Sequence, residues 1–176
     1  MIPRDYSLFI ALTLTLLLFS QSTAWGRGQL HIIGTGPSGP QMATLQALET
    51  IKQMDALIAP DEHVQLFADY VWDKPVLFDP WVGVWDYKGK SIELLNKEER
   101  KAYSKERSRV LDERVGKIRE LLAEGKDVGL LDYGNPCLFG PSHWYIEPFA
   151  QEDLVIIPGM GSDAAVMAVL GKSIRF

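Results

Sequence analysis

The sequence predicts an α/β protein in which a parallel five-stranded sheet carries helices on both faces. Short apolar runs alternate along the chain with segments whose apolar residues recur at helical spacing, and this alternation is typical of parallel sheets. Most of the runs are made of Val, Ile and Leu without a polar alternation, which indicates strands buried on both faces. Ligands of such sheets bind beyond the carboxyl ends of the strands, so a site is expected in the loops that follow the strands.

The first third of the chain supplies two strands and two helices. The run at 29–33 stops at a glycine and predicts the first strand. Residues 41–54 carry apolar side chains at helical spacing and predict the first helix. The run at 56–59 predicts the second strand, which ends at Pro60, and the segment 61–70 predicts a helix that begins at an acidic residue.

The middle of the chain supplies two more strands and a long helix. The run at 75–78 predicts the third strand, and the turn-rich, aromatic residues 79–90 predict a loop. Residues 96–124 predict a long helix with a charged, solvated face, and 128–131 predicts the fourth strand. The apolar stripe of the long helix consists of Leu111, Val115, Ile118 and Leu122.

The last predicted elements are a fifth strand at 154–157 and a small apolar helix at 164–170. A chain of 176 residues is long enough for one domain of this kind, because domains have about 100–200 residues.

The composition narrows the range of functions. A formal net charge of −5 and a pI near 5.2 do not suit a nucleic-acid partner, which would require a basic face. The single cysteine, Cys137, excludes an internal disulfide and a multi-cysteine metal site. No other residues have metal-ligand spacing, so we expect no metal.

Residues 1–24 are predicted to be a targeting segment rather than part of the fold. Arg4 precedes a long apolar stretch, and the small residues Ser22 and Ala24 stand at the −3 and −1 positions of a cleavage site. A secretory signal peptide of this kind predicts export to the periplasm or the medium. The alternative is an uncleaved membrane anchor through residues 8–20.

The loop after the first strand has a glycine pattern that suits a nucleotide. Gly34, Gly36 and Gly39 match G-x-G-x-x-G between a strand and a helix, which is the dinucleotide fingerprint, and Asp61 lies about twenty residues further on. A Rossmann-type oxidoreductase is therefore one alternative. Prolines in the loop, such as Pro37, argue against it, because each removes an N–H that could donate to a pyrophosphate.

Two further strand-end loops are rich in glycine and proline. Residues 132–143 follow the fourth strand, and residues 158–163 follow the fifth. Three such loops on adjacent strand ends predict a cleft that can hold a nucleoside-sized ligand.

The order of these motifs is similar to that of a known family. A glycine-rich loop at 34–40 precedes a Thr-Leu-Gln-Ala-Leu helix start at 44–48, a Gly-Asn-Pro loop at 134–136 and a Pro-Gly-Met-Gly-Ser turn at 158–162. Together they resemble the N-terminal domain of the tetrapyrrole (corrin/porphyrin) methylase family, whose counterparts include Gly-Asp-Pro and Pro-Gly-Ile-Thr-Ser. The resemblance spans residues 30–174.

The resemblance implies a methyltransferase that uses S-adenosyl-L-methionine and transfers its methyl group in line to an acceptor that the sequence does not identify. It assigns no catalytic residue. The predicted cofactor-binding residues are Gly34, Gly36, Pro37, Tyr133, Gly134, Asn135, Leu138, Gly161 and Ser162.

The same resemblance suggests the kind of acceptor, a small molecule or a peptide. Residues 133–136 and 141–143 are similar to a loop of relatives that methylate peptide backbones. Those relatives place a functional arginine at the spacing of Arg107, but their partner tyrosine falls at Leu111 and is not reproduced. His143 is a candidate base, which we interpret as a packing or hydrogen-bonding residue.

The family has a second α/β domain of similar size, and its members bind the cofactor between the two domains. We therefore interpret residues 25–163 as the N-terminal domain and residues 164–176 as the start of the linker to a truncated C-terminal domain. Self-association, or a second chain that supplies the other domain, is expected. The alternative function is a non-catalytic relic of the fold that binds a ligand or a partner.

Overall fold

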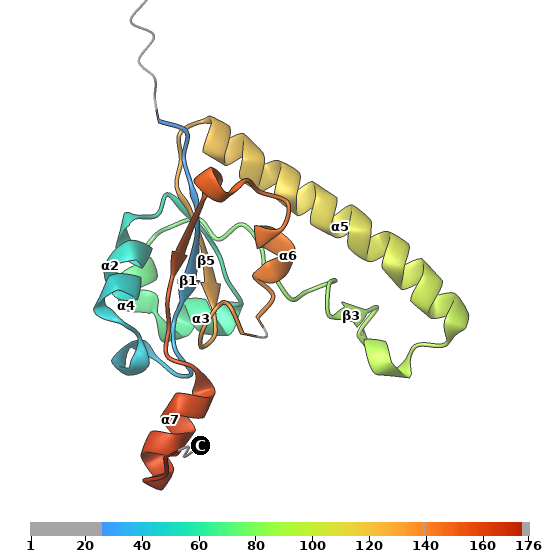
Figure 1. Ribbon diagram of the computed structural model, residues 1–176. Coiled ribbons are helices and arrows are strands. Elements are labelled where there is room, and N and C mark those ends of the chain that lie inside the picture. Colours follow the sequence, from blue (N-terminus) through green and yellow to red (C-terminus); the bar gives the residue numbers. More distant parts are fainter. Residues whose placement is uncertain (1–25, 139, 174–176) are drawn as a thin grey trace, which may run out of the picture.

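A central sheet covered by helices on both faces forms the body of the protein (Figure 1). The computed structural model describes residues 26–138 and 140–173 of the chain. The sheet has four parallel strands in the order β2-β5-β1-β6, so the predicted α/β class and parallel direction are confirmed. The strands are β1 (Leu30–Gly34), β2 (Ala56–Ile58), β5 (Val128–Asp132) and β6 (Leu154–Ile157).

The prediction of the third strand, at 75–78, is wrong, and the sheet has four strands instead of the five expected. This segment forms one isolated parallel bridge beside β2, between Leu57 and Val76. The next bond runs from the Ala59 nitrogen to the Phe78 oxygen, at 3.2 Å. A continued parallel ladder would require the Leu77 oxygen there, so the register slips by one residue and the pairing stops.

Two hydrophobic clusters fix the helices to the two faces of the sheet. One cluster joins the sheet to α2 (Leu45–Gln53), α3 (Asp61–Leu66) and α4 (Ala68–Val71). The other joins it to α5 (Lys97–Ala123) and α6 (His143–Ile146). Alternate residues of β1 enter different clusters, because successive side chains of a strand point to opposite faces.

Two helix predictions need new boundaries. The helix expected at 41–54 begins only at Leu45, because Thr44 caps it with a side-chain oxygen that accepts a bond from the Ala47 nitrogen at 3.0 Å. The helix expected at 61–70 divides at Phe67, whose backbone leaves the helical region. A 3₁₀ turn at Pro40–Met42 precedes the first of these helices.

The long helix at 96–124 is confirmed as α5 (Figure 1). Asn96 and Glu99 form a capping box at its start. Gly125 follows it with a φ of +79°, as expected for the residue after a helix. Of the predicted apolar stripe, Val115, Ile118 and Leu122 are buried, and Leu111 packs at the edge of the same cluster.

The loop predicted at 79–90 contains part of a short hairpin, which the sequence analysis missed. Its strands are β3 (Asp86–Tyr87) and β4 (Lys90–Ser91). Further turns are 3₁₀ helices at Ile92–Leu94 and Gln151–Asp153.

The final helix, α7 (Ser162–Leu170), extends away from the body of the protein (Figure 1). It starts two residues before its predicted position at 164. Within 26–138 and 140–173, no helix combines the length and the apolar character needed to cross a bilayer. The predicted targeting segment at 1–24 lies outside the described residues.

Candidate functional site

Three loops at the carboxyl edge of the sheet converge on one cavity of about 680 Å³. The loop after β1 contributes Pro37, the loop after β5 contributes Tyr133 and Asn135, and the turn after β6 contributes Ser162. The three strands are neighbours and parallel, so their carboxyl ends meet at the same edge. Below, this space is called the loop cavity. Its other lining residues are Trp81, Asp132, Gly134, Leu138, Gly140, Gly161 and Asp163.

The loop cavity contains most, but not all, of the residues that were predicted to bind a cofactor. Gly34 and Gly36 are not among its lining residues. Contact of any of these residues with a cofactor stays a prediction. Those that line the cavity are Pro37, Tyr133, Gly134, Asn135, Leu138, Gly161 and Ser162.

Glycines fasten the three loops to one another through their backbones. Gly36 and Gly134 exchange two hydrogen bonds, at 3.4 and 2.9 Å. A Cβ atom on Gly34 would lie 2.5 Å from the Gly159 nitrogen, and one on Gly159 would lie 2.1 Å from the Gly134 oxygen. Larger residues would separate the loops. Gly34 and Gly36 therefore position the walls of the cavity.

The start of α7 offers hydrogen-bond donors to the loop cavity. Gly161 is its N-cap residue, and no side chain there accepts a bond from the first-turn amides. The first N–H groups of a helix have no partner within the helix. These amides and the positive end of the helix dipole are therefore available to the acceptor atoms of a ligand.

A buried acid, Asp132, fixes the loop after β5 through contacts with Ser142. Its side chain is almost fully buried, and the Ser142 hydroxyl lies 2.5 Å from its Oδ2 atom and 2.8 Å from the Pro136 oxygen. One hydroxyl proton can serve only one of these oxygens. Both contacts become hydrogen bonds when Asp132 is protonated and donates to Ser142. Burial raises the pKa of Asp132, which favours this neutral form.

Tyr133 is held as a rigid wall of the cavity. Its ring stacks on the buried His63 with 3.8 Å between centroids, and its hydroxyl donates to Glu62 at 2.6 Å. The His63 Nε2 atom lies 2.9 Å from the Thr35 hydroxyl. Burial lowers the pKa of His63 to about 4 and raises that of Tyr133, so both rings are neutral near pH 7.

Three tryptophans meet beside the loop cavity. Trp81 lies edge-on to Trp85, with 5.7 Å between centroids, and to Trp144, with 6.4 Å. Trp72 is not in this cluster and is 85% exposed. The cluster places one indole, that of Trp81, in the wall of the cavity.

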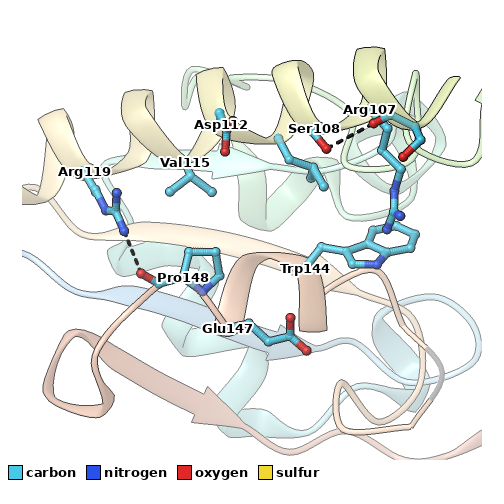
Figure 2. A pocket seen from close by; sticks show the side chains of 10 residues that line it. Arg107, Ser108, Asp112, Val115, Arg119, Trp144, Glu147 and Pro148 are labelled. Carbon is cyan, nitrogen blue, oxygen red and sulfur yellow. Dashed lines mark hydrogen bonds between the residues drawn. The ribbon is translucent and has the colours of Figure 1, made fainter. Parts of the chain in front are cut away.

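Arg107 lies in a different cavity, of about 650 Å³, between α5 and α6. Figure 2 shows its side chain beside the Trp144 ring, with 4.7 Å between the guanidinium carbon and the ring centroid. Nearby, Tyr103 donates a hydrogen bond to the Val84 oxygen. The geometry therefore gives Arg107 a stacking role away from the loop cavity.

His143 also lies outside the loop cavity. Its Nδ1 atom is 2.7 Å from the Gly140 oxygen, and its ring packs on Trp144 at 4.6 Å. The contacts agree with its interpretation as a packing and hydrogen-bonding residue. In the part of the chain that the structure describes, no three His, Cys, Asp or Glu side chains gather as metal ligands would, and Cys137 is exposed.

The loop cavity suits a nucleoside-sized ligand. Its volume falls within the range of about 300–1,000 Å³ that is usual for ligand sites. Gly134 and Gly161 bring backbone to the cavity surface, the amides of α7 donate, and Leu138 and Tyr133 supply apolar contact.

Comparison with known proteins decides the family. The model of the Tetrapyrrole (Corrin/Porphyrin) Methylases matches residues 29–176. The chain belongs to the tetrapyrrole methylase family. A curated relative is the cobalamin biosynthesis protein CbiHC of Archaeoglobus fulgidus, which is 24% identical to this chain over 152 residues. That match covers 84% of the present chain and 28% of the relative.

Solved structures show the same fold. A cobalt precorrin-4 methyltransferase, CbiF, matches with a TM-score of 0.59 and 22% identity, over 89% of the present chain and 56% of the CbiF chain. The cobalamin synthesis related protein CobF of Corynebacterium diphtheriae matches with a TM-score of 0.56 and 20% identity, over 86% and 61% of the two chains. The present chain thus spans little more than half of the solved relatives.

Four lining residues of the loop cavity escaped the sequence analysis. Asp132 is an acid at the end of a buried strand, and that position is itself a signal, since buried acids are rare. Trp81 had a signal in the aromatic loop, but nothing in the sequence showed which tryptophan faces the site. Gly140 and Asp163 lie within two of the strand-end loops in which the sequence predicts a site.

Proposed function

We propose that this member of the tetrapyrrole methylase family binds S-adenosyl-L-methionine in the loop cavity and acts as a methyltransferase. The observation that carries the proposal is the convergence of Pro37, Asn135 and Ser162, from three separate loops, on one cavity of suitable size. Bound there, the cofactor supplies a methyl group on a sulfonium, and the transfer requires a nucleophile in line with it.

The residues of the chain would chiefly hold the reactants in place. The α7 amides and the backbone at Gly134 and Gly161 would contact the nucleoside and amino-acid parts of the cofactor. Tyr133, fixed by His63 and Glu62, would limit its position. Orientation of this kind can contribute about 7–11 kcal/mol to a reaction between two bound groups.

Titration calorimetry with S-adenosylhomocysteine tests the cofactor site. We expect saturable binding to the folded chain, and loss of at least about tenfold in affinity for Leu138→Trp, whose indole would fill the cavity that Leu138 lines. Leu94→Trp is the matched control, because Leu94 is exposed on a turn that does not line the loop cavity. Absence of heat with a folded sample would favour the non-catalytic relic. Equal binding by both variants would contradict binding in the loop cavity.

A partner would cover the apolar surface of α7. Val166, Val169 and Leu170 are each more than half exposed, and apolar patches of this kind often mark interfaces. We propose that a second copy of this chain, or another chain, packs there. Light scattering at tens of micromolar tests the first option, and a monodisperse monomer would contradict it.

The cellular location and the acceptor also belong to the proposal. Residues 1–24 would direct export, which N-terminal sequencing of the mature protein tests. An N-terminus at Met1 would contradict cleavage. The acceptor would be a small molecule or a peptide.

A further inference from the structure

A second depression adjoins the loop cavity and shares two of its walls. This aromatic groove, of about 710 Å³, is lined among others by Trp81, Trp85 and Tyr133. Trp81 and Tyr133 also line the loop cavity. A molecule in the groove would therefore lie next to a ligand in the loop cavity, which is where a methyl acceptor has to be.

The rings of the groove are held in place and yet open to solvent. Trp81 and Trp85 meet edge to face at an interplanar angle of 88°. The Tyr133 ring is stacked on the buried His63. Trp85 remains 58% exposed, and a large exposed indole beside other rings is typical of a surface that contacts a ligand or a partner.

Every charged side chain that lines the groove is an acid. They are Asp61, Glu62 and Asp79. Asp79 Oδ1 accepts a hydrogen bond from the backbone nitrogen of Trp81 at 2.8 Å, and Glu62 Oε1 accepts one from the Tyr133 hydroxyl at 2.6 Å. Each of these bonds occupies one oxygen of its carboxylate, so the second oxygen of Asp79 and of Glu62 takes no part in it. Among the described residues, none of the three acids has an ion pair within 4.0 Å.

The charge and the rings favour the same kind of ligand. Ring faces attract a cation through their quadrupoles, and uncompensated carboxylates attract it through Coulomb forces, while both disfavour an anion. Ammonium or guanidinium groups match this surface, and carboxylate-rich acceptors do not.

We propose that the aromatic groove binds the methyl acceptor through a cationic group, an ammonium or a guanidinium. The acceptor role rests on the proposed function of the loop cavity. The cationic group is the part that is recognised, and the groove places the rest of the acceptor toward Trp81 and Tyr133, the walls that the two spaces share.

Choline is a suitable probe, because its carbon analogue, with a carbon atom in place of the nitrogen, has the same shape and no charge. The indole N–H resonances of the full chain are followed during titration with each compound, and Trp→Phe variants assign them. We expect choline to shift the resonances of Trp81 and Trp85 in a saturable manner. The uncharged analogue should bind at least about tenfold more weakly.

Variants test the contributions of the carboxylates and of the aromatic rings separately. Asp61→Asn removes one charge and breaks no hydrogen bond, because the Asp61 side chain forms none with the residues that the structure describes. Asp69→Asn, on the exposed surface of α4, is the matched control. Trp85→Leu removes a ring that is largely exposed. We expect Asp61→Asn and Trp85→Leu to weaken choline binding and Asp69→Asn to leave it unchanged.

The outcomes separate this inference from the proposed function. Binding of S-adenosylhomocysteine without binding of choline would contradict cation binding in the aromatic groove. It would leave the proposed cofactor site in the loop cavity standing. Equal binding of choline and its carbon analogue, or shifts confined to other tryptophans, would also overturn it. Binding of choline without S-adenosylhomocysteine would overturn the acceptor role. Binding of both, with the expected variant effects, supports the inference.

Discussion

Gly36 and Gly134 join two loops that lie far apart in the sequence through a pair of backbone hydrogen bonds, at 3.4 and 2.9 Å. Both have positive φ, +78° and +64°, a conformation that costs other residues about 1–2 kcal/mol. The contact fixes the loop after β1 against the loop after β5. The shape of the loop cavity depends on it.

Gly36→Ala tests this contact. The new Cβ would lie 2.4 Å from the Met42 oxygen, so the variant suffers both backbone strain and a clash. Gly83→Ala is the matched control, because Gly83 has a φ of +70° and no atom within 4 Å of its Cβ position. We expect Gly36→Ala to lower the free energy of unfolding by at least about 1 kcal/mol more than the control. Urea denaturation measures both, and equal losses would contradict the proposed role.

The buried His63 predicts a loss of stability in acid. Its pKa is about 4 in the folded protein, against 6.5 for a free histidine. Between these values the unfolded chain binds more protons, so the free energy of unfolding falls as the pH drops from 6.5 through 4. The full effect is about 3 kcal/mol. His63→Phe keeps a ring against Tyr133 and removes the titration. If its stability fell by the same amount over this range, His63 would not be the cause.

The buried Asp132 is expected to have the opposite effect, a free energy of unfolding that falls as the pH rises. Because burial raises its pKa above the ordinary 3.8, the folded protein retains a proton that the unfolded chain loses. The contribution of Asp132 to the free energy of unfolding is complete below pH 3.8. It is lost as the pH rises through the higher pKa of the folded protein. Asp132→Asn stays neutral and can still donate to Ser142. Urea denaturation should show the variant gaining on the wild type as the pH approaches neutrality.

The control for that comparison is Asp163→Asn, a change at an exposed acid on the rim of the same cavity. A constant difference between Asp132→Asn and wild type at all pH values would show that Asp132 does not titrate in the folded protein.

Arg107→Ala tests whether this residue serves the cofactor. Its guanidinium stacks on Trp144 in the cavity between α5 and α6, so we expect a loss of about 1 kcal/mol in stability. The affinity for S-adenosylhomocysteine should stay within about twofold of wild type. A larger loss of affinity in a folded variant would place Arg107 in the site after all.

The sequence predicts the elements that local chemistry specifies and misses those that depend on packing. The start of α5 at its Asn96 cap and its end at Gly125 follow from the capping residues and from the helical spacing of its apolar side chains. The segment 75–78 is equally apolar, yet its pairing with β2 stops after one bridge, because register along a sheet edge is a tertiary property. The split of the helix expected at 61–70 likewise has no local breaker in the sequence.

The candidate site shows the same division. Loop positions followed from strand order, and Pro37, Asn135 and Ser162 do line one cavity. Asp132 and Trp81 were missed, since which side chains of a strand end and an aromatic loop face inward depends on how the loops pack. Gly34 and Gly36 do not line the cavity but contact other loops, and their contact with a cofactor stays a prediction.

Main-chain atoms alone make the junction of Gly34, Gly36, Gly134 and Gly159. Such a junction does not depend on the identity of the side chains that face the ligand. Exchanges at positions such as Tyr133 or Ser162 can therefore change ligand preference during evolution while the scaffold persists, which is a physical reason for a single scaffold to serve many chemistries.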